Sequence, residues 1–188
     1  MKINQRLRRH LSLVEVVVAL AILTLAFSGS MSLYYSSATY SRSSAQRSEA
    51  RTLVLAELAT LRRTLRTAPF MNGSTDNRAT LFNDVVTNDP NGAFGGGGTT
   101  FTRTRVVTMD RGRLNATIVA TCYFSESLGE TALGLTGGLD LDADGATGSA
   151  AAIAPADMWA LPTTVSITWN PVESQGGTET MTVSGVLY

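Results

Sequence analysis

An unbroken apolar run near the start of the chain limits what this sequence can fold into. The seventeen residues 11–27 contain one charged residue, Glu15, and neither Gly nor Pro. Continued to residue 35, the run has twenty-five residues, more than the ~20 that a helix needs to cross a bilayer. The ten residues before it carry four basic side chains and no acidic one. Positive charge before a span favours the cytoplasmic side, so we expect residues 36–188 on the other side.

Composition excludes several classes of function. The 188 residues include one Cys, Cys122, and one His, His10. A disulfide framework, a multi-Cys zinc site and a Ser-His-Asp centre are therefore excluded. The sequence has neither a phosphate-binding loop nor the glycine motif of dinucleotide-binding folds. Because no nucleophile–base pair or metal constellation can be assembled from these residues, we expect the protein not to be an enzyme.

The charges are divided unevenly along the chain. Residues 1–67 contain ten basic and three acidic residues, whereas residues 68–188 contain five basic and twelve acidic ones. This asymmetry indicates that the two parts meet different surroundings. A sequence pI near 6.6 disfavours a basic nucleic-acid-binding domain, and we do not expect nucleic acid as a partner. A small exposed basic patch is expected around one turn, from Arg103, Arg105, Arg111 and Arg113.

Glu15 is the exception within the apolar run. A carboxylate inside an apolar membrane helix costs about 2.5–3.5 kcal/mol on insertion scales. One interpretation is a tolerated acid near the membrane edge, where the side chain can reach water. The other is a carboxylate that awaits a cation from another chain.

The residues around Glu15 form a short signal. The basic leader ends at His10 and is followed by Leu-Ser-Leu-Val-Glu at positions 11–15, then by a run of Val, Ala, Leu and Ile. This order resembles the class III signal of type IV pilins and type II secretion pseudopilins. Residues 17–23 resemble the minor pilin V and pseudopilin I subgroup. The resemblance covers about the first fifty-five residues, and beyond them it is one of architecture.

The resemblance implies a processing and assembly mechanism. A prepilin peptidase would cut between His10 and Leu11 and methylate the new amine of Leu11. Glu15 would then pair with the N-terminal amine of a neighbouring subunit. The family has Gly before the cut, where this chain has His10. Without the cut, Leu11 has no free amine and Glu15 loses the expected partner.

The function implied is that of a structural subunit of a type IV pilus or type II secretion pseudopilus. It would insert in the inner membrane in a single pass, with its N-terminus cytoplasmic, and then join a periplasmic or cell-surface filament. The partners implied are other pilins or pseudopilins, the prepilin peptidase and the inner membrane, and no cofactor is required. The alternative is a membrane-anchored or secreted binding or adhesion domain that holds a calcium loop and does not polymerise.

An ordinary secretory signal is the competing interpretation of the N-terminal segment. The basic start and apolar run fit it, and small residues within 26–28 or 28–30 offer a cleavage site. Glu15 within the run and its smooth continuation into a helical pattern argue against it.

A second, amphipathic helical segment follows the apolar run. Residues 49–66 are rich in Ala, Leu, Glu and Arg, and Pro69 ends the pattern. One apolar face is formed at spacings of four, three and four by Val54, Leu58, Leu61 and Leu65. A single helix over residues 11–66 would span roughly 84 Å. A soluble domain of this size cannot bury such a helix, so its first half must lie in a membrane or against other copies.

Four alternating segments predict two antiparallel hairpins. The first pairs residues 100–109 with 113–124 and places Cys122 in the buried phase; the second pairs 163–170 with 178–187. Residues 70–99 are expected to connect the helix to the sheet, with a short element at 80–86. Residues 125–157 are expected to form a long Gly/Ala-rich excursion, that is, a connection between the two hairpins.

The predicted fold class is α+β: a long N-terminal helix, its first half transmembrane, packed on a four-stranded antiparallel sheet. The chain divides into a leader, residues 1–10, a transmembrane and assembly helix, residues 11–35, and an extracytoplasmic pilin-like domain, residues 36–188.

Residues 125–157 contain a candidate cation site. Asp140, Asp142 and Asp144 alternate before Gly145, as at the start of a calcium loop. The twelfth position, where such loops carry a bidentate acid, is Ala151, so Asp157 or backbone carbonyls would have to complete the shell. The competing interpretation is a solvated Asp/Gly loop without metal.

Overall fold

The computed structural model describes residues 12–66, 71–72, 75–76, 94–110, 112–154, 157–171 and 177–188. The chain forms two compact units, Met1–Ser44 and Ala45–Tyr188. Helix α1, Leu13–Arg66, contributes residues to both. The short element expected at residues 80–86 lies outside the described residues.

In the first unit, the described residues belong almost entirely to α1. Residues 12–37 are all exposed, including large apolar side chains such as Leu25, Phe27 and Leu33. By length and composition, α1 is apolar enough to cross a membrane, and none of its most apolar stretch is buried. This exposure distinguishes it from the core helix of a soluble protein, whereas a signal sequence near the N-terminus would pass the same test.

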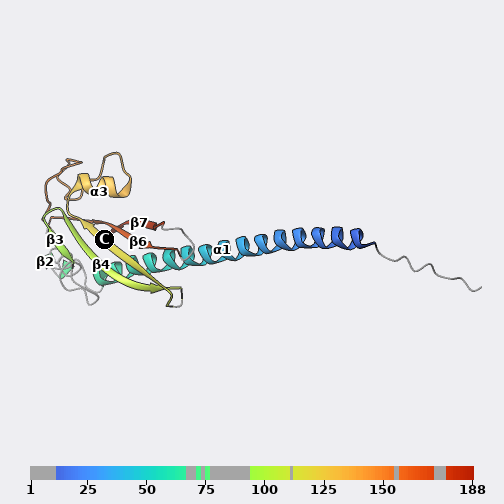
Figure 1. The fold of residues 1–188 in the computed structure, drawn as a ribbon. Helices are drawn as coiled ribbons and strands as arrows, with labels where there is room; N and C mark the ends of the chain where they lie inside the picture. The colour runs from blue at the N-terminus through green and yellow to red at the C-terminus, as the bar shows by residue number, and fades with distance from the viewer. Residues whose placement is uncertain are drawn as a thin grey trace, which may run out of the picture. The chain divides into compact units, whose positions relative to one another are not determined.

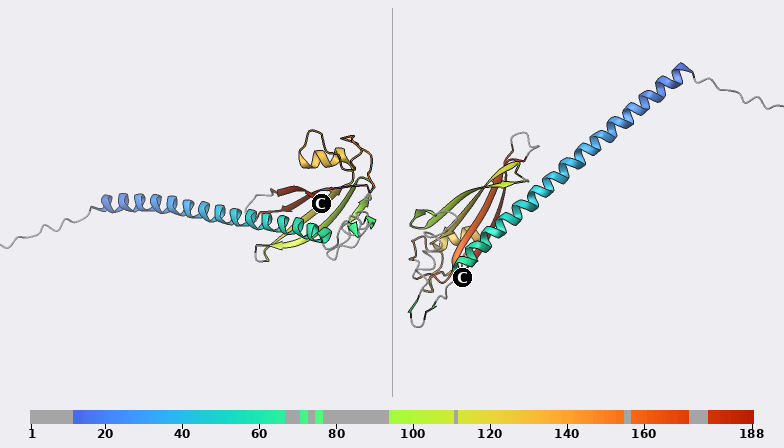
Figure 2. Two further views of the ribbon diagram at one scale, coloured as in Figure 1. Left: turned by 180° about the vertical axis from the view of Figure 1, so that it is seen from behind. Right: turned by 90° about the horizontal axis from the view of Figure 1, so that it is seen from below.

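In the second unit, residues 45–66 of α1 cover one face of the β-sheet (Figures 1 and 2). The expected apolar face is confirmed, since its four residues are at most 5 % exposed. Burying side chains of this size contributes about 1.5–3 kcal/mol each. The buried apolar residues of this part of α1 are Ala50, Val54, Leu58, Leu61 and Leu65.

The sheet has five antiparallel strands in the order β3-β4-β5-β6-β7. The strands are β3 (Gly95–Gly97), β4 (Thr100–Met109), β5 (Leu114–Tyr123), β6 (Leu161–Trp169) and β7 (Glu179–Leu187). The four predicted strands are present as β4–β7, and the α+β fold class is confirmed. The three-residue β3 adds an edge that the sequence did not predict. A separate two-stranded ladder joins β1 (Met71–Asn72) and β2 (Thr75–Asp76).

Alternate residues of each strand face α1. Gly185 of β7 faces α1, because a Cβ added there would lie 3.4 Å from the Leu58 side chain. The register places Gly185 opposite Thr163, which fixes the inward phase of β6. The buried inward residues of the two central strands are Ala116, Ile118, Ala120, Cys122, Thr163, Val165, Ile167 and Trp169. The outward phase of β4–β7 carries no charged residue and consists mostly of Thr and Ser.

Helix α3, Glu126–Leu133, lies in the segment for which the sequence predicted only a Gly/Ala-rich excursion. Gly134 ends it in a left-handed conformation, φ 71°, which glycine adopts without strain. The helix packs on the face of the sheet opposite α1, where a Cβ on Gly129 would lie 2.8 Å from Pro162 Cγ. The absence of a side chain at residue 129 therefore permits this close approach. The helix was missed because it is short and its neighbourhood is rich in glycine.

Candidate functional site

The N-terminal site is described from Ser12 onward, and His10 and Leu11 lie outside the described residues. Ser12 precedes α1, and its Oγ accepts a hydrogen bond from the Val14 backbone N–H at 3.2 Å. The Glu15 carboxylate accepts one from the Ser12 backbone N–H at 3.4 Å. This reciprocal arrangement is a capping box, which satisfies donors that a helix N-terminus leaves without intrahelical partners.

The capping box gives Glu15 a local role that was not predicted from the sequence. The signal for it was the Ser-x-x-Glu spacing of residues 12–15. A carboxylate in the first turn is also favoured by the positive end of the helix dipole. Glu15 is therefore accommodated at the end of the apolar helix, where a carboxylate is less costly than at its centre.

The acidic loop after α3 contains the three predicted carboxylates. Each accepts a hydrogen bond from a backbone N–H within the loop: Asp140 from Gly145 at 3.1 Å, Asp142 from Asp144 at 3.3 Å and Asp144 from Ala146 at 2.7 Å. Gly145 adopts φ 84°, so the turn at the sixth position does require glycine. The loop is thus held partly by its own carboxylates.

Two glutamates of α3 attach this loop to the fold. The buried Glu126 accepts hydrogen bonds from the backbone N–H groups of Leu141 at 2.9 Å and Ser149 at 3.0 Å. Glu130 accepts one from Leu139 at 2.9 Å. The start and the end of the loop are therefore fixed to the same helix.

Glu126 also changes the composition of the candidate cation site. One carboxylate oxygen from each of Glu126, Asp140 and Asp142 lies within 4.8 Å of the other two. Asp144 and Asp157 are not members of this group of described residues. Glu126 was not predicted as a ligand, because it lies fourteen residues before Asp140 in a helix that was not predicted.

The electrostatics of the loop reflect this crowding. The pKa of Asp142 is raised above its ordinary value, mainly because desolvation disfavours the charged carboxylate. The negative charges of Asp144, Glu126 and Asp140 shift it in the same direction. A divalent cation would reverse this effect, and carboxylate oxygens are the ligands that calcium prefers. Each of the three aspartates already accepts a backbone hydrogen bond, so the conformation of the loop is also explained without a metal.

The expected basic patch is not an exposed surface. Arg103 and Arg105 share a strand face as predicted, but this face is turned toward α1, and both guanidinium groups bind the carboxylate of Glu57. Burial lowers the pKa of Arg103, and the charge of Arg105 adds to this shift. Arg111 lies outside the described residues, and Arg113 is exposed. The prediction of an exposed arginine at 103 is therefore wrong, because Arg103 is buried against Glu57, whereas Arg105 pairs with the same carboxylate and its side chain stays 36 % exposed.

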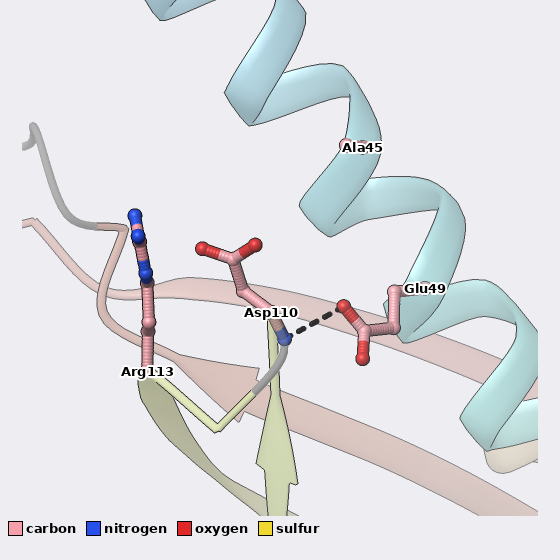
Figure 3. A pocket seen from close by; sticks show the side chains of 4 residues that line it. All are labelled: Ala45, Glu49, Asp110 and Arg113. Carbon is pink, nitrogen blue, oxygen red and sulfur yellow. Dashed lines mark hydrogen bonds between the residues drawn. The ribbon is translucent and has the colours of Figure 1, made fainter.

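A shallow hollow lies where the β4–β5 turn meets α1 (Figure 3). Ala45, Glu49, Asp110 and Arg113 line it. Glu49 accepts a hydrogen bond from the Asp110 backbone N–H at 2.8 Å, and Asp110 has a left-handed backbone with φ 49°. This hydrogen bond fixes the turn to the helix. We therefore assign the residues that line the hollow a structural role in holding the hairpin.

Comparisons with known proteins do not assign this chain to a family. No family model matches it, and neither a curated protein nor a solved structure matches it.

Proposed function

We propose that the protein is a non-enzymatic structural subunit of a type IV pilus or type II secretion pseudopilus. The observation that carries the proposal is the exposed apolar part of α1, which has a single acid in its first turn. Apolar side chains without protein cover require lipid or other protein around them. The same segment would lie in the inner membrane before assembly and in the filament core afterwards.

Glu15 would set the register between subunits. Cleavage between His10 and Leu11 would create an amine, which the Glu15 carboxylate of a neighbouring subunit would neutralise. Pairing two opposite charges in a low-dielectric helix bundle removes the cost of burying either of them alone. The capping box supports this role, because it holds the carboxylate at the N-terminal end of the helix.

The N-terminus of protein recovered from cells tests the processing step. We expect mass spectrometry to find mature chains that begin at methylated Leu11. Replacing His10 with Gly, the residue of the family at this position, should maintain or increase the processed fraction. Mature chains that begin near residues 27–31 would instead support an ordinary secretory signal, and intact chains would remove the amine on which assembly depends.

Two substitutions of Glu15 separate its charge from its capping role. Gln at this position keeps a capping acceptor but removes the charge, whereas Ala removes both. We expect both variants to insert in the membrane and both to fail to enter filaments. Normal incorporation of Glu15→Gln would show that the charge is not needed.

The alternative function, an anchored or secreted calcium-loop domain that does not polymerise, predicts the opposite result. Under it, Glu15 variants would behave like the parent chain, and loss of the acidic loop would remove binding. The approach of Glu126, Asp140 and Asp142 is compatible with this alternative.

A further inference from the structure

Within the second unit, α1 carries exposed basic side chains, one of which, Arg62, reaches toward β7, where its guanidinium would lie 3.5 Å from a Cβ added to Gly185. Arg51, Arg62 and Arg63 are exposed, and among the described residues no hydrogen bond or ion pair engages their side chains. The two acids of the same helical stretch cannot neutralise them, because Glu49 holds the Asp110 backbone and Glu57 is buried. These three exposed arginines are called the arginine face.

The side of the unit that bears α3 is acidic. After Arg113 the sequence contains eight acidic residues and no Lys or Arg. Three of these acids, Asp140, Asp144 and Asp157, are exposed in the segment that follows α3. Because Glu126 and Glu130 fix residues 139–149 to α3, the charges of the loop have a defined position. Asp140 and Asp144, the exposed aspartates of this loop, are called the aspartate face.

The two faces cannot meet within one chain. Residues 45–66 of α1 and helix α3 pack on opposite faces of the sheet (Figures 1 and 2). Gly185 contacts α1 on one side, and Pro162, in the opposite phase of the neighbouring strand, contacts α3 on the other. Among the described residues, the arginine face can therefore meet the aspartate face only on another molecule.

We propose that the arginine face of one copy of this chain binds the aspartate face of a second copy. Opposite charges across an interface fix its register and exclude like-charged approaches. Because the two faces lie on opposite sides of the sheet, the contact is heterologous, and a heterologous contact that does not close into a ring generates an open helical array. The inference rests on the proposed filament function and names the surface through which extracytoplasmic domains touch.

Cysteine cross-linking of the full chain in membranes tests the contact. Ala59 lies on the arginine face and Ala146 lies in the acidic loop, and both are exposed. Two differently tagged chains, Ala59→Cys and Ala146→Cys, are co-expressed and treated with a short bis-maleimide in the presence of a chelator. The native Cys122 is buried and adds no background. We expect a mixed dimer, and none when Thr182→Cys on the uncharged outer face of β7 replaces Ala146→Cys.

Charge reversal shows whether electrostatics make the contact. We expect Arg62→Glu with Arg63→Glu on the Ala59→Cys chain to lower the mixed-dimer yield about tenfold, equivalent to about 1.4 kcal/mol. Adding Asp144→Lys to the other chain should restore part of the yield. Salt should also lower the yield, since the Debye length falls from about 10 Å at 0.1 M to about 3 Å at 1 M.

The outcomes distinguish this contact from the filament proposal. Absence of the mixed dimer, a yield indifferent to charge, or cross-links from residue 59 only to other proteins would overturn the pairing of two copies. If Glu15→Gln still abolishes filament entry in the same cells, the filament proposal survives that failure. A charge-dependent mixed dimer in cells where Glu15→Gln has no effect would support the contact and count against the filament.

Discussion

The buried carboxylate of Glu57 on α1 binds the buried guanidinium of Arg103 on β4. Arg105 binds the other oxygen of the same carboxylate, and the Arg103 guanidinium lies 5.0 Å from the centre of the Phe94 ring. The contact joins helix and sheet through charged groups next to the apolar side chains that α1 buries on the sheet. Removing one partner of a buried ion pair is costly, because the remaining charge has lost both water and its counter-ion.

Replacing Glu57 with Ala should therefore destabilise the second unit strongly. We expect the free energy of unfolding to fall by about 3–5 kcal/mol, since the buried Arg103 would lose its carboxylate partner. Denaturant unfolding of the full chain in detergent, followed by Trp fluorescence, measures the change.

The exposed pair between Arg47 and Glu179 provides the matched control. Its atoms approach to 3.0 Å, but the Arg47 side chain is 62 % exposed, so water and salt screen the attraction. Glu179→Ala should have a much smaller effect than Glu57→Ala. Equal effects of the two substitutions would contradict a special role for burial at Glu57.

The thiol of Cys122 should be unreactive in the folded protein. Burial raises the pKa of Cys122 to about 12, although a hydrogen bond from Thr163 and the charge of Arg103 act in the opposite direction. At pH 8 only about one thiol in 10,000 would be the reactive thiolate, so iodoacetamide should label the chain only after denaturation. Rapid labelling of the native protein would show that this strand is not packed as described.

The same shift predicts a loss of stability at alkaline pH. An unfolded cysteine ionises near pH 8.5, whereas the folded one ionises only near 12. The contribution of Cys122 to stability is therefore complete below about pH 8.5 and is lost as the pH rises toward 12. Cys122→Ala should flatten this part of the pH profile of unfolding, although other groups that titrate there would remain.

Gly129→Ala should destabilise the protein although Ala favours helices. The added Cβ would lie 2.8 Å from Pro162 Cγ and 3.1 Å from a Leu139 side-chain carbon. Overpacking of this kind costs about 1–3 kcal/mol, which exceeds the ~1 kcal/mol gain in helix propensity. Gly97→Ala, where a Cβ meets nothing within 4 Å, should change the unfolding free energy by less than about 0.5 kcal/mol.

Millimolar calcium should raise the melting temperature of the full chain if the acidic loop binds it. A bound cation would offset the mutual repulsion of Glu126, Asp140 and Asp142 and stabilise the folded state by mass action. Differential scanning fluorimetry with calcium, and with a chelator, measures the shift. No change at millimolar calcium would remove the site.

Asp142→Asn is the matched variant for this test. Asn retains the oxygen that accepts the Asp144 N–H bond but has no charge. Because the folded pKa of Asp142 is raised, its ionisation opposes folding, and stability from this group is lost as pH rises through that pKa. In chelator the variant should therefore be more stable at neutral pH than the parent chain, and it should lose the calcium response.

Period-two alternation was sufficient to locate the sheet. The segment predicted as residues 100–109 is β4 without a change of bounds, and the inward phase around Ile118 and Ile167 is buried as expected. Alternation does not reveal what covers a face, so Arg103 and Arg105 were assigned to solvent. The burial of Arg103 and the pairing of Arg105 depend on Glu57, which lies 46 residues before Arg103 in sequence and reaches it only when α1 packs on the sheet.

The acidic loop was located by its spacing but not by its partners. Alternating Asp residues before Gly145 predicted converging carboxylates, and Asp140 and Asp142 do converge. The third member, Glu126, belongs to an eight-residue helix whose propensity signal is weakened by Gly129. Packing against β6, a tertiary contact, stabilises that helix and brings Glu126 to the loop.

By itself, the sequence determined the elements whose cause is local. The uninterrupted apolar run yields a helix able to cross a membrane, and alternating apolar residues yield the strands, because periodicity fixes which face each side chain takes. Only the tertiary structure decided which charged side chains pair within the fold and which stay exposed to solvent. Glu57 forms ion pairs with two arginines, and Glu126 accepts hydrogen bonds from two backbone amides, whereas Arg62 and Asp157 remain exposed. The physical reason is that desolvation and pairing depend on distances between segments that the linear order of residues does not contain.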